Sequence, residues 1–357
     1  MIAGGGTGGH IYPAVAIGRA LMKLDDHCEV RFVGTADGLE QKIMAREKLP
    51  LDLISSGKLN FKGRFFQKLK TMIKIPYGLL QSFVLIWKHQ PGFVLGVGGY
   101  ASAPFLLAAV FMRKKVAVWE PNAHPGMANR LLSRLVPKAY LVFDEAKKYL
   151  SCREFQVFGM PLRAEMDEAQ EQNLSSEHQA DRLTILCFGG SQGSLFLNEK
   201  ISDFILSHPE LHDQIFLIHQ TGSLGFSAMK QKYGDLKCVE VHEFIYDMPK
   251  YYRQADIQFC RGGASTIAEA AAFGVVPLVV PLPAADDHQE KNAEVLVKNQ
   301  AGFLFKQNQF DEQQFFQTIL KLKNNLEYRK QMAQNLKKIA PFQAATEIAK
   351  DILKQIL

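Results

Sequence analysis

The amino-acid sequence predicts an α/β protein with two Rossmann-like, doubly wound domains that face each other across a cleft. In both halves of the 357-residue chain, apolar runs typical of strands alternate with helical patterns, which indicates parallel sheets covered by helices on both faces. Glycine-rich turns at 4–9, 189–193 and 261–266 follow such runs and begin helices. The chain is long enough for two cores of ordinary size.

The first half opens with a strand at 1–3, the glycine loop 4–9 and a helix with Pro13 near its first turn. This strand is so short that we expect the natural chain to begin a few residues upstream of Met1. The further strands expected in this half are 29–34, 93–97, 116–119 and 140–143.

An acidic stretch, 164–182, then interrupts the alternation. It has few large apolar residues, as expected for a connection between domains. The second half resumes with the apolar run 183–188, the turn 189–193 and a helix from about Ser194. Its other expected strands are 215–219, 239–241, 257–260 and 275–280.

The end of the chain predicts an amphipathic helix that returns to the first half. After Pro341, apolar residues recur at helical spacing from Ala345 to Ile356. The predicted domains are therefore 1–163 plus 342–357, and 164–341.

The composition is that of a soluble globular protein, with 47% hydrophobic and 22% charged residues. The five cysteines are scattered, without a CxxC pair or a Cys/His cluster at zinc-ligand spacing, which indicates reduced thiols in the cytosol. We find no signal peptide and no apolar run long enough to span a bilayer.

Basic and apolar residues are mixed in one long segment that contains no Asp or Glu, between Leu53 and Trp119. This mixture favours an anionic membrane surface over a nucleic-acid groove, because the apolar residues are too many for the latter. A solvated basic face over ordinary core helices is the alternative, and Phe83 and Trp87 fit either core or lipid contact. The basic residues are Lys58, Lys62, Arg64, Lys68, Lys70, Lys74, Lys88, Arg113, Lys114 and Lys115.

The glycine turns predict phosphate binding. Each would aim backbone N–H groups and the positive end of a helix dipole at one point beyond the carboxyl end of a strand. Two turns in the second half would hold a nucleotide diphosphate, and the loop 4–9 a second phosphorylated molecule, which suggests group transfer between them. Hydride transfer fits poorly, because the first loop runs into His10 and no acidic residue closes the second strand at Gly34.

A series of motifs, in this order and at compatible spacing, covers nearly the whole chain. They are GGTGGH (5–10), GVGGYAS (96–102), EPN (120–122), GMPLR (159–163), GGSQG (189–193), EFIYDM (243–248), CRGGASTIAE (260–269) and DHQEKNA (287–293). This set resembles the MurG-type UDP-N-acetylglucosamine:N-acetylmuramyl-(pentapeptide) pyrophosphoryl-undecaprenol N-acetylglucosaminyltransferases. The resemblance implies a GT-B fold. It also implies inverting transfer of GlcNAc from UDP-GlcNAc to the C4 hydroxyl of lipid I, which gives lipid II in peptidoglycan synthesis.

The same resemblance implies a role for each domain and for individual residues. The first domain would bind the acceptor and the membrane, and the second UDP-GlcNAc. The residues near the acceptor diphosphate and sugar would be Thr7, Gly8 and Gly9. The donor phosphates would meet Ser191 and the helix start at Ala264, Ser265, Thr266, Ile267 and Ala268. The rest of the donor set would be the backbone of Ile245 on uracil, Glu269 on ribose, Gln289 on GlcNAc, and Asn122 and Arg163. Motif positions without a separate role are Tyr100, Asn129, Asn198 and Arg261.

For the general base, His10 is the first candidate and Glu120 the alternative. His10 closes the first glycine loop and has a near-neutral reference pKa, although it could instead cap the helix or bind acceptor phosphate. Helix N-termini and an Arg can carry the charge of the departing UDP. We therefore expect no tightly bound cofactor and no dedicated metal site, although a divalent cation can accompany the substrate. The family often has His-Glu-Gln-Asn where this chain has WEPN (119–122), so no role of that His and Gln is carried over.

Two kinds of alternative function stay open at this point. One is another GT-B enzyme, either a diacylglycerol glycosyltransferase or a UDP-GlcNAc 2-epimerase; the other is a non-catalytic UDP-GlcNAc sensor. The expected partners are UDP-GlcNAc, undecaprenyl-linked lipid I and an anionic membrane surface, with cell-wall synthesis proteins as candidates and no nucleic acid. The expected location is peripheral, on the cytoplasmic face of the bacterial inner membrane, with a part in cell shape and division.

Overall fold

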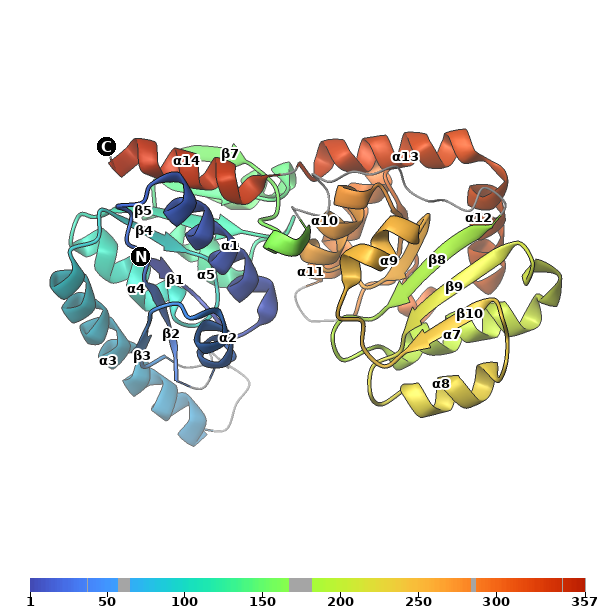
Figure 1. Ribbon diagram of the computed structural model, residues 1–357. Helices are drawn as coiled ribbons and strands as arrows, with labels where there is room; N and C mark the ends of the chain where they lie inside the picture. The colour runs from blue at the N-terminus through green and yellow to red at the C-terminus, as the bar shows by residue number, and fades with distance from the viewer. Residues whose placement is uncertain (37, 57–64, 167–181, 284–286, 342, 357) are drawn as a thin grey trace. The chain divides into compact units, whose positions relative to one another are not determined.

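In the computed structural model the chain forms two compact units, unit 1 with residues Met1–Arg163 and Phe342–Leu357, and unit 2 with Ala164–Pro341 (Figure 1). The structure describes residues 1–36, 38–56, 65–166, 182–283, 287–341 and 343–356, and of residues 65–75 the backbone alone. Each unit is built on one parallel sheet with helices between its strands, so the predicted α/β class is confirmed.

The sheet of unit 1 has the strand order β3-β2-β1-β4-β5-β6-β7, and all its strands are parallel. Ala3 of β1 lies opposite Val33 of β2 on one side and Gly96 of β4 on the other, so the strand order reverses at β1. The strands are β1 (Ile2–Ala3), β2 (Phe32–Thr35), β3 (Leu51–Ile54), β4 (Phe93–Gly96), β5 (Lys115–Glu120), β6 (Lys138–Leu141) and β7 (Glu154–Val157).

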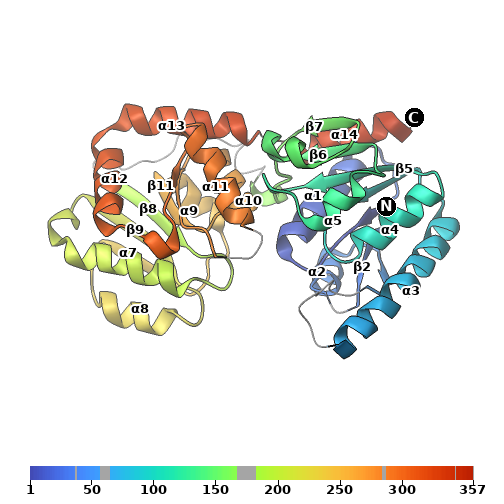
Figure 2. The same cartoon turned by 180° about the vertical axis from the view of Figure 1, so that it is seen from behind.

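Helices cover both faces of this sheet (Figures 1 and 2). On one face α1 packs against α14, and on the other α4 packs against α3 and α5. The last helix is fastened to the sheet by a partly buried ion pair between Lys138 Nζ and Asp351 Oδ2 (2.7 Å). The Tyr140 hydroxyl also donates to Asp351 Oδ2 (2.6 Å). The helices are α1 (Gly8–Leu24), α2 (Glu40–Glu47), α3 (Phe65–His89), α4 (Ser102–Phe111), α5 (Met127–Leu132) and α14 (Ala344–Ile356).

Unit 2 repeats this scheme with the strand order β10-β9-β8-β11-β12-β13. Cys187 of β8 lies opposite Phe259 of β11, so the order reverses between these two strands. The strands are β8 (Leu183–Phe188), β9 (Ile215–Gln220), β10 (Val239–His242), β11 (Ile257–Cys260), β12 (Val276–Val279) and β13 (Phe303–Leu304).

The core of unit 2 is aliphatic under α7 and aromatic under α12. Leu197 and Ile201 of α7 are fully buried, and the Phe259 ring lies 4.7 Å from that of Phe315 on α12. The helices are α7 (Leu195–Ser207), α8 (Phe226–Tyr233), α9 (Met248–Gln254), α10 (Ala264–Phe273), α11 (His288–Lys298), α12 (Glu312–Asn324) and α13 (Leu326–Ile339).

The structure has strands that the sequence does not predict, β3, β7 and β13. β3 and β7 are the two edge strands of the first sheet, and β13 is an edge strand of the second. None of the three is a continuous buried apolar run. An exposed edge needs fewer apolar residues than a central strand, so the pattern in the sequence is weak there. All the cysteines are thiols, and Cys28 alone among them is not buried.

Candidate active site

In unit 1, the glycine loops after β1 and β4 lie against each other. Both Gly98 and Gly99 have a left-handed backbone, with φ of 93° and 79°. A Cβ on Gly99 would overlap the backbone of Gly5, and one on Gly98 would lie 2.8 Å from Cε1 of His10. Glycine is therefore required for this close approach, which brings the motifs GGTGGH and GVGGYAS together where the strand order reverses.

His10 lies in the first turn of α1. The helix starts after Thr7, whose carbonyl accepts from the N–H of His10 (3.1 Å) and whose side chain makes no cap. Close by, the Arg163 guanidinium lies 5.7 Å from the ring centre of Tyr12, and the Tyr100 ring flanks Gly6. Separate segments of unit 1 thus bring several of the predicted residues to the carboxyl ends of its strands. They are Thr7, Gly8, Gly9, His10, Tyr100 and Arg163.

Glu40 supports the first glycine loop, and the sequence analysis missed it. Its side chain is 1% exposed; Oε2 accepts from the Gly6 N–H (2.8 Å), and Oε1 accepts from the N–H and hydroxyl of Thr35 (both 2.8 Å). Burial raises the pKa of this carboxyl, but the hydrogen bonds outweigh burial and the pKa is lowered. The signal in the sequence was an acid in the first turn of a helix, after the glycines at 34 and 38.

Glu120, the alternative base, ends β5 and is 2% exposed. Its Oε1 accepts from the backbone N–H (2.9 Å) and Nδ2 (3.2 Å) of Asn122. Its Oε2 accepts from the N–H of Gly126 (3.2 Å) and from Nδ2 of Asn129 (2.9 Å). Burial raises the pKa of Glu120, and these hydrogen bonds oppose the rise. Because both oxygens hold the following loop, the geometry favours a positioning role for Glu120 over that of a base.

In unit 2, the turn after β8 is shaped by glycines. The carbonyl of Gly190 accepts from the Gly193 N–H (3.0 Å), and both glycines have positive φ, at 87° and 77°. Ser191 is exposed at the tip of this turn. Ser194 caps α7 by accepting from the Leu197 N–H (3.4 Å), so strand, turn and capped helix follow one another as the sequence predicts.

The second turn of unit 2 leads from β11 into α10. The cap residue Gly263 supplies no side-chain hydrogen bond, while the Ile267 N–H donates to the Gly263 carbonyl (3.0 Å). The helix-start amides that lack an intrahelical acceptor are therefore those of residues 264–266, and Ile267 and Ala268 contribute buried side chains. Glu269 lies one turn on, where its Oε2 accepts from the Tyr252 hydroxyl (3.3 Å).

Arg261 joins the two turns of unit 2. Its Nη2 donates to Oγ of Ser194 (2.6 Å), and its Nη1 donates to the carbonyls of Val280 (3.1 Å) and Pro281 (3.2 Å). Burial lowers the pKa of this guanidinium. Arg261 therefore links the cap of α7 to the backbone at the end of β12.

Gln289 fastens the start of α11 to the turn after β11. Its Oε1 accepts from the N–H groups of Gly262 (3.1 Å) and Leu282 (2.9 Å). A Cβ on Gly262 would overlap the backbone of Gln289, so this glycine permits the contact. Gln289, which we expect to contact the donor sugar, therefore also holds the backbone at Gly262 and Leu282 in place.

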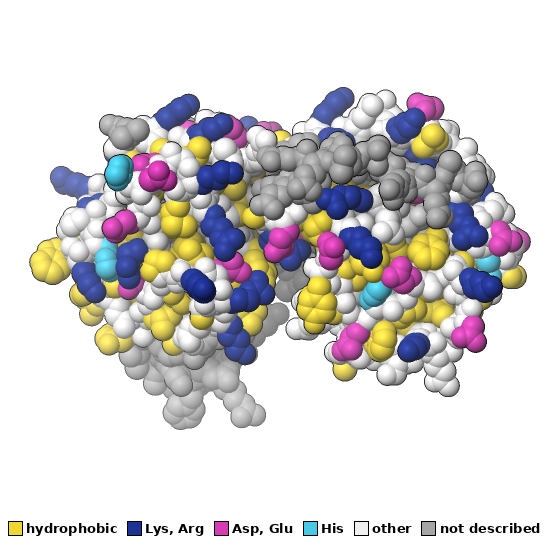
Figure 3. Space-filling model, in the orientation of Figure 1, with side chains coloured by type: hydrophobic (Ala, Val, Ile, Leu, Met, Phe, Trp, Pro, Cys, Tyr) yellow, Lys and Arg dark blue, Asp and Glu magenta, His cyan; other side chains and the backbone are white. Residues whose placement is uncertain are grey.

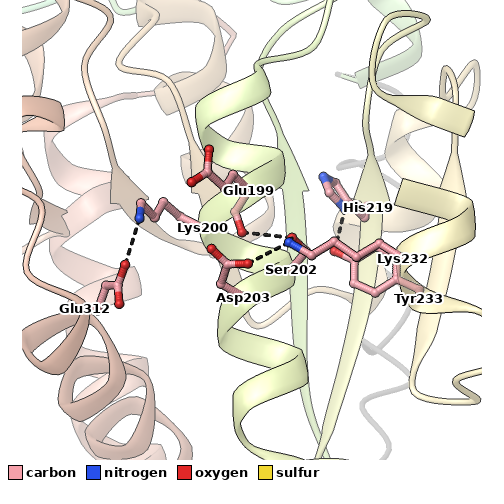
Figure 4. Close-up of polar contacts among 8 residues, drawn as sticks. All are labelled: Glu199, Lys200, Ser202, Asp203, His219, Lys232, Tyr233 and Glu312. Atoms are coloured by element: carbon pink, nitrogen blue, oxygen red, sulfur yellow. Dashed lines mark hydrogen bonds and ion pairs between the residues drawn. The ribbon is translucent and has the colours of Figure 1, made fainter. Parts of the chain in front are cut away.

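Asn198 belongs to a buried network between α7 and β9. Its Nδ2 donates to the Thr221 carbonyl (2.9 Å), and its Oδ1 contacts Nε2 of His219 (3.0 Å). Figure 4 shows His219 beside Tyr233, the last residue of α8, with 2.9 Å between Nδ1 and the hydroxyl. Sequence reasoning missed His219, because it lies near the end of an apolar strand, where a histidine is expected to be a core residue without a separate role.

Ion pairs fasten α7 to its neighbours on both sides (Figure 4). Lys200 Nζ contacts Glu312 of α12 at 2.7 Å. Lys232 of α8 contacts Asp203 at 2.6 Å and donates to the Ser202 hydroxyl at 2.8 Å. These contacts hold the helix that begins after the turn 189–193.

Ile245 lies after β10 and is 3% exposed. Its backbone is the part expected to read uracil, and the backbone N–H donates to Oε1 of Gln220 (2.9 Å). Within the described ranges, no group of three or more His, Cys, Asp or Glu side chains is arranged to hold a metal ion. The expectation about cations and cofactors stays a prediction.

The region expected at a membrane surface is described in part. Residues Lys58, Lys62 and Arg64, and the side chains of Lys68, Lys70 and Lys74, lie outside the description. Among the side chains of α3 that the structure describes, the exposed large apolar ones are Tyr77, Leu80, Val84 and Trp87, with 55%, 63%, 62% and 72% of their surface exposed. Their spacing of 3, 4 and 3 places them on one face of the helix, so Trp87 is not a core residue. Phe83 is half-buried and lies 6.4 Å from the exposed Phe111 ring.

Two doubly wound sheets, with glycine turns where their strand orders reverse, fit the two-domain GT-B class of fold, in which ligands bind beyond the carboxyl ends of the strands. The sequence models of the glycosyltransferase family 28 N-terminal domain and C-terminal domain match residues 1–141 and 184–356. The chain belongs to glycosyltransferase family 28 and, within it, to the MurG-type N-acetylglucosamine transferases, as its relatives show.

A UDP-N-acetylglucosamine–N-acetylmuramyl-(pentapeptide) pyrophosphoryl-undecaprenol N-acetylglucosamine transferase of Bdellovibrio bacteriovorus is 52% identical, covering 99% of this chain and 98% of that protein. A transferase of the same name from Myxococcus xanthus is 35% identical, covering 98% and 91%. The crystal structure of Acinetobacter baumannii MurG superposes with a TM-score of 0.82 at 28% identity, over 99% of both chains. A UDP-GlcNAc 2-epimerase of Neisseria meningitidis, with a TM-score of 0.68 and 14% identity, shares the fold alone. The predicted family and GT-B fold are thereby confirmed.

Proposed function

We propose that this protein transfers GlcNAc from UDP-GlcNAc to the C4 hydroxyl of undecaprenyl-pyrophosphoryl-MurNAc-pentapeptide, with inversion at the anomeric carbon. The observation that carries this proposal is the 52% identity to a transferase of that name over 99% of the chain. The turn after β11 supports it, because the helix start at 264–266 has backbone amides without an intrahelical acceptor beyond the strand end, where an anion can bind. The product is lipid II, so the protein acts in peptidoglycan synthesis.

Donor binding is assigned to unit 2. The diphosphate would contact Ser191 and the helix-start amides of 264–266, where the positive end of the α10 dipole stabilises negative charge. Glu269 would accept hydrogen bonds from the ribose, and Gln289 would contact the sugar hydroxyls. As the glycosidic bond breaks, charge develops on UDP, and these fixed amides stabilise it in the transition state.

The acceptor hydroxyl needs a general base, and His10 is the candidate that the geometry favours. Its imidazole lies against Gly98 where the two glycine loops of unit 1 meet. Glu120 is buried and accepts hydrogen bonds on both oxygens, so it would shape the loop that carries Asn122. His10 would take the proton from the C4 hydroxyl as the new bond forms.

The protein would bind the membrane that carries its acceptor through the apolar face of α3. Exposed Leu80, Val84 and Trp87 lie on this face, and the helix belongs to the acid-free basic segment. An apolar helix face within a basic segment binds anionic lipid by apolar burial and by about 1 kcal/mol per cation. The face of unit 1 drawn in Figure 3 carries basic, acidic and hydrophobic side chains together. No helix in the described part of the chain is long and apolar enough to cross a bilayer.

The proposed location is the cytoplasmic face of the bacterial inner membrane, where the protein would be peripheral. Its partners there would include the enzymes that make and use the lipid-linked substrates, which connects it with cell shape and division.

The activity is tested by following UDP release from UDP-GlcNAc with different acceptors. We expect release that requires a muramoyl-pyrophosphoryl-polyprenol acceptor and gives a disaccharide product. Release with diacylglycerol, or interconversion of the free sugar nucleotide, would show a different enzyme. UDP-GlcNAc binding without turnover on any acceptor would indicate a sensor.

Membrane binding is tested by flotation with vesicles that contain anionic lipid. Replacing Leu80, Val84 and Trp87 together by Ser should reduce binding strongly, while Leu224→Ser with Leu326→Ser, at exposed positions of unit 2, should leave it unchanged. Binding should also weaken as salt rises, because exposed charges are screened. Replacing Lys68, Lys70 and Lys74 by Glu should abolish it. If these changes leave binding intact, the segment is a solvated face.

A further inference from the structure

Gln220, the last residue of β9, connects two segments of the proposed donor site. Its Nε2 donates to the Gly190 carbonyl at 3.1 Å, in the turn after β8. Its Oε1 accepts from the Ile245 N–H at 2.9 Å, in the loop after β10. The three strands are neighbours in the sheet, with β9 between the other two (Figure 1), and the Gln220 side chain is 3% exposed.

We propose that Gln220 is a positioning residue that sets the spacing between the base and the phosphate subsites of the donor nucleotide. The proposal rests on the proposed function, in which the turn at Ser191 binds phosphate and the backbone of Ile245 reads uracil. The two hydrogen bonds of the Gln220 side chain are to backbone groups of Gly190 and Ile245. It holds the two recognition segments at one fixed separation.

The chemistry of the bridge requires an amide at this position. The Gly190 carbonyl, which also accepts from the Gly193 N–H, takes a second hydrogen bond here, and the Ile245 N–H needs an acceptor. A Gln side chain presents both a donor and an acceptor on one planar group. The orientation of the amide is therefore fixed by its partners. Buried polar groups that lose such a partner cost about 1–3 kcal/mol.

Fixing the Gly190 carbonyl also aims the next amide. The peptide bond between Gly190 and Ser191 is planar and trans, so the Ser191 N–H points away from the Gly190 oxygen. That oxygen is held from two sides, by the Gly193 N–H (3.0 Å) and by Gln220. Gln220 thereby helps to direct the Ser191 amide, although it lies on another strand.

The test compares the affinities of wild type, Gln220→Glu and Gln220→Leu for UDP and for uridine by calorimetry. At pH 8 the introduced carboxylate still accepts from Ile245 but repels the Gly190 carbonyl. We expect UDP to bind about 10- to 100-fold more weakly and uridine to change by less than about threefold. Gln220→Leu breaks both contacts, so both ligands should weaken.

A pH series separates positioning from general structural support. A protonated carboxyl has both a donor and an acceptor, as the amide has. Burial beside the Gly190 carbonyl should raise the pKa of this carboxyl above its ordinary value of about 4.3. Lowering the pH from 8 to 5.5 should therefore restore UDP binding in Gln220→Glu, relative to wild type at the same pH, and leave Gln220→Leu weak. In turnover assays at pH 8, Gln220→Glu should raise the KM for UDP-GlcNAc by about 10-fold or more with kcat within about threefold. The matched control is Gln214→Glu. Gln214 also has an amide side chain and lies just before the first residue of β9, and its substitution should behave as wild type.

The outcomes distinguish this inference from the proposed function. If wild type fails to bind UDP, the proposed function is wrong. If wild type binds UDP and Gln220→Glu binds it equally well at pH 8, the positioning role is wrong. An equal loss of UDP and uridine affinity in Gln220→Glu, without recovery at pH 5.5, would also overturn it.

Discussion

The imidazole of His219 contacts the side-chain amide of Asn198, with 3.0 Å between Nε2 and Oδ1. Because Nδ2 of Asn198 donates to the Thr221 carbonyl, Oδ1 can only accept, and Nε2 of His219 carries the proton. Nδ1 then accepts from the Tyr233 hydroxyl. A Cβ on Gly193 would overlap the Thr221 carbonyl, so this directed chain of hydrogen bonds ends against the turn 189–193.

Asn198→Asp should weaken donor binding. The carboxylate cannot donate to Thr221, so it repels that carbonyl, while it still accepts from His219. We expect the Kd for UDP, measured by calorimetry, to rise about 10-fold or more. Asn299→Asp, which removes a similar side-chain bond to the backbone in α11, should leave the Kd unchanged. Equal effects of both substitutions would contradict a specific role of the network.

His219 should make stability depend on pH. Burial lowers its pKa to about 3 from an ordinary value of 6.5. Between these values the unfolded chain binds a proton that the folded protein does not, so stability falls as the pH is lowered through this window. The contribution approaches about 1.4 kcal/mol per pH unit. Urea unfolding from pH 7 to 5 should show a shallower loss in His219→Gln than in wild type, and identical slopes would refute this.

Glu40→Gln should impair the use of the acceptor substrate and leave donor binding nearly unchanged. The substitution places an NH₂ group against the N–H of Gly6 or Thr35, and loses hydrogen bonds worth about 1–3 kcal/mol of stability. We expect lower kcat/KM for the acceptor, a lower Tm, and UDP affinity within about twofold of wild type. Glu29→Gln, at an exposed position before β2, is the control. A change confined to UDP affinity would rule out support of the first glycine loop.

His10→Ala should lower turnover by about 10²- to 10⁴-fold, with UDP affinity nearly intact, if His10 is the general base. Glu120→Gln should act differently, since it disturbs the loop that Asn122 and Asn129 share with it, and should lower the Tm as well. Single-turnover rates with saturating donor measure the difference. Turnover near that of wild type in His10→Ala would place the base elsewhere.

The fold and the glycine turns could be predicted because they depend on local sequence. A glycine in a tight turn, such as Gly190 or Gly193, marks its own position, and long apolar strands such as β8 mark theirs. Glu40 and Gln220 could not be found in this way, because their partners are 34 and 30 residues away in the chain. The turn 261–266 shows both cases. The sequence predicts the helix start in this turn, but it gives no role to Arg261, which links the turn to the cap of α7.

The most direct test of the account is a crystal structure of the protein with UDP. We predict that the diphosphate lies against Ser191 and the amides of 264–266, with uracil at the backbone of Ile245 and ribose at Glu269. A diphosphate bound anywhere else, above all at the glycine loop 4–9, would contradict the assignment of the donor site to unit 2.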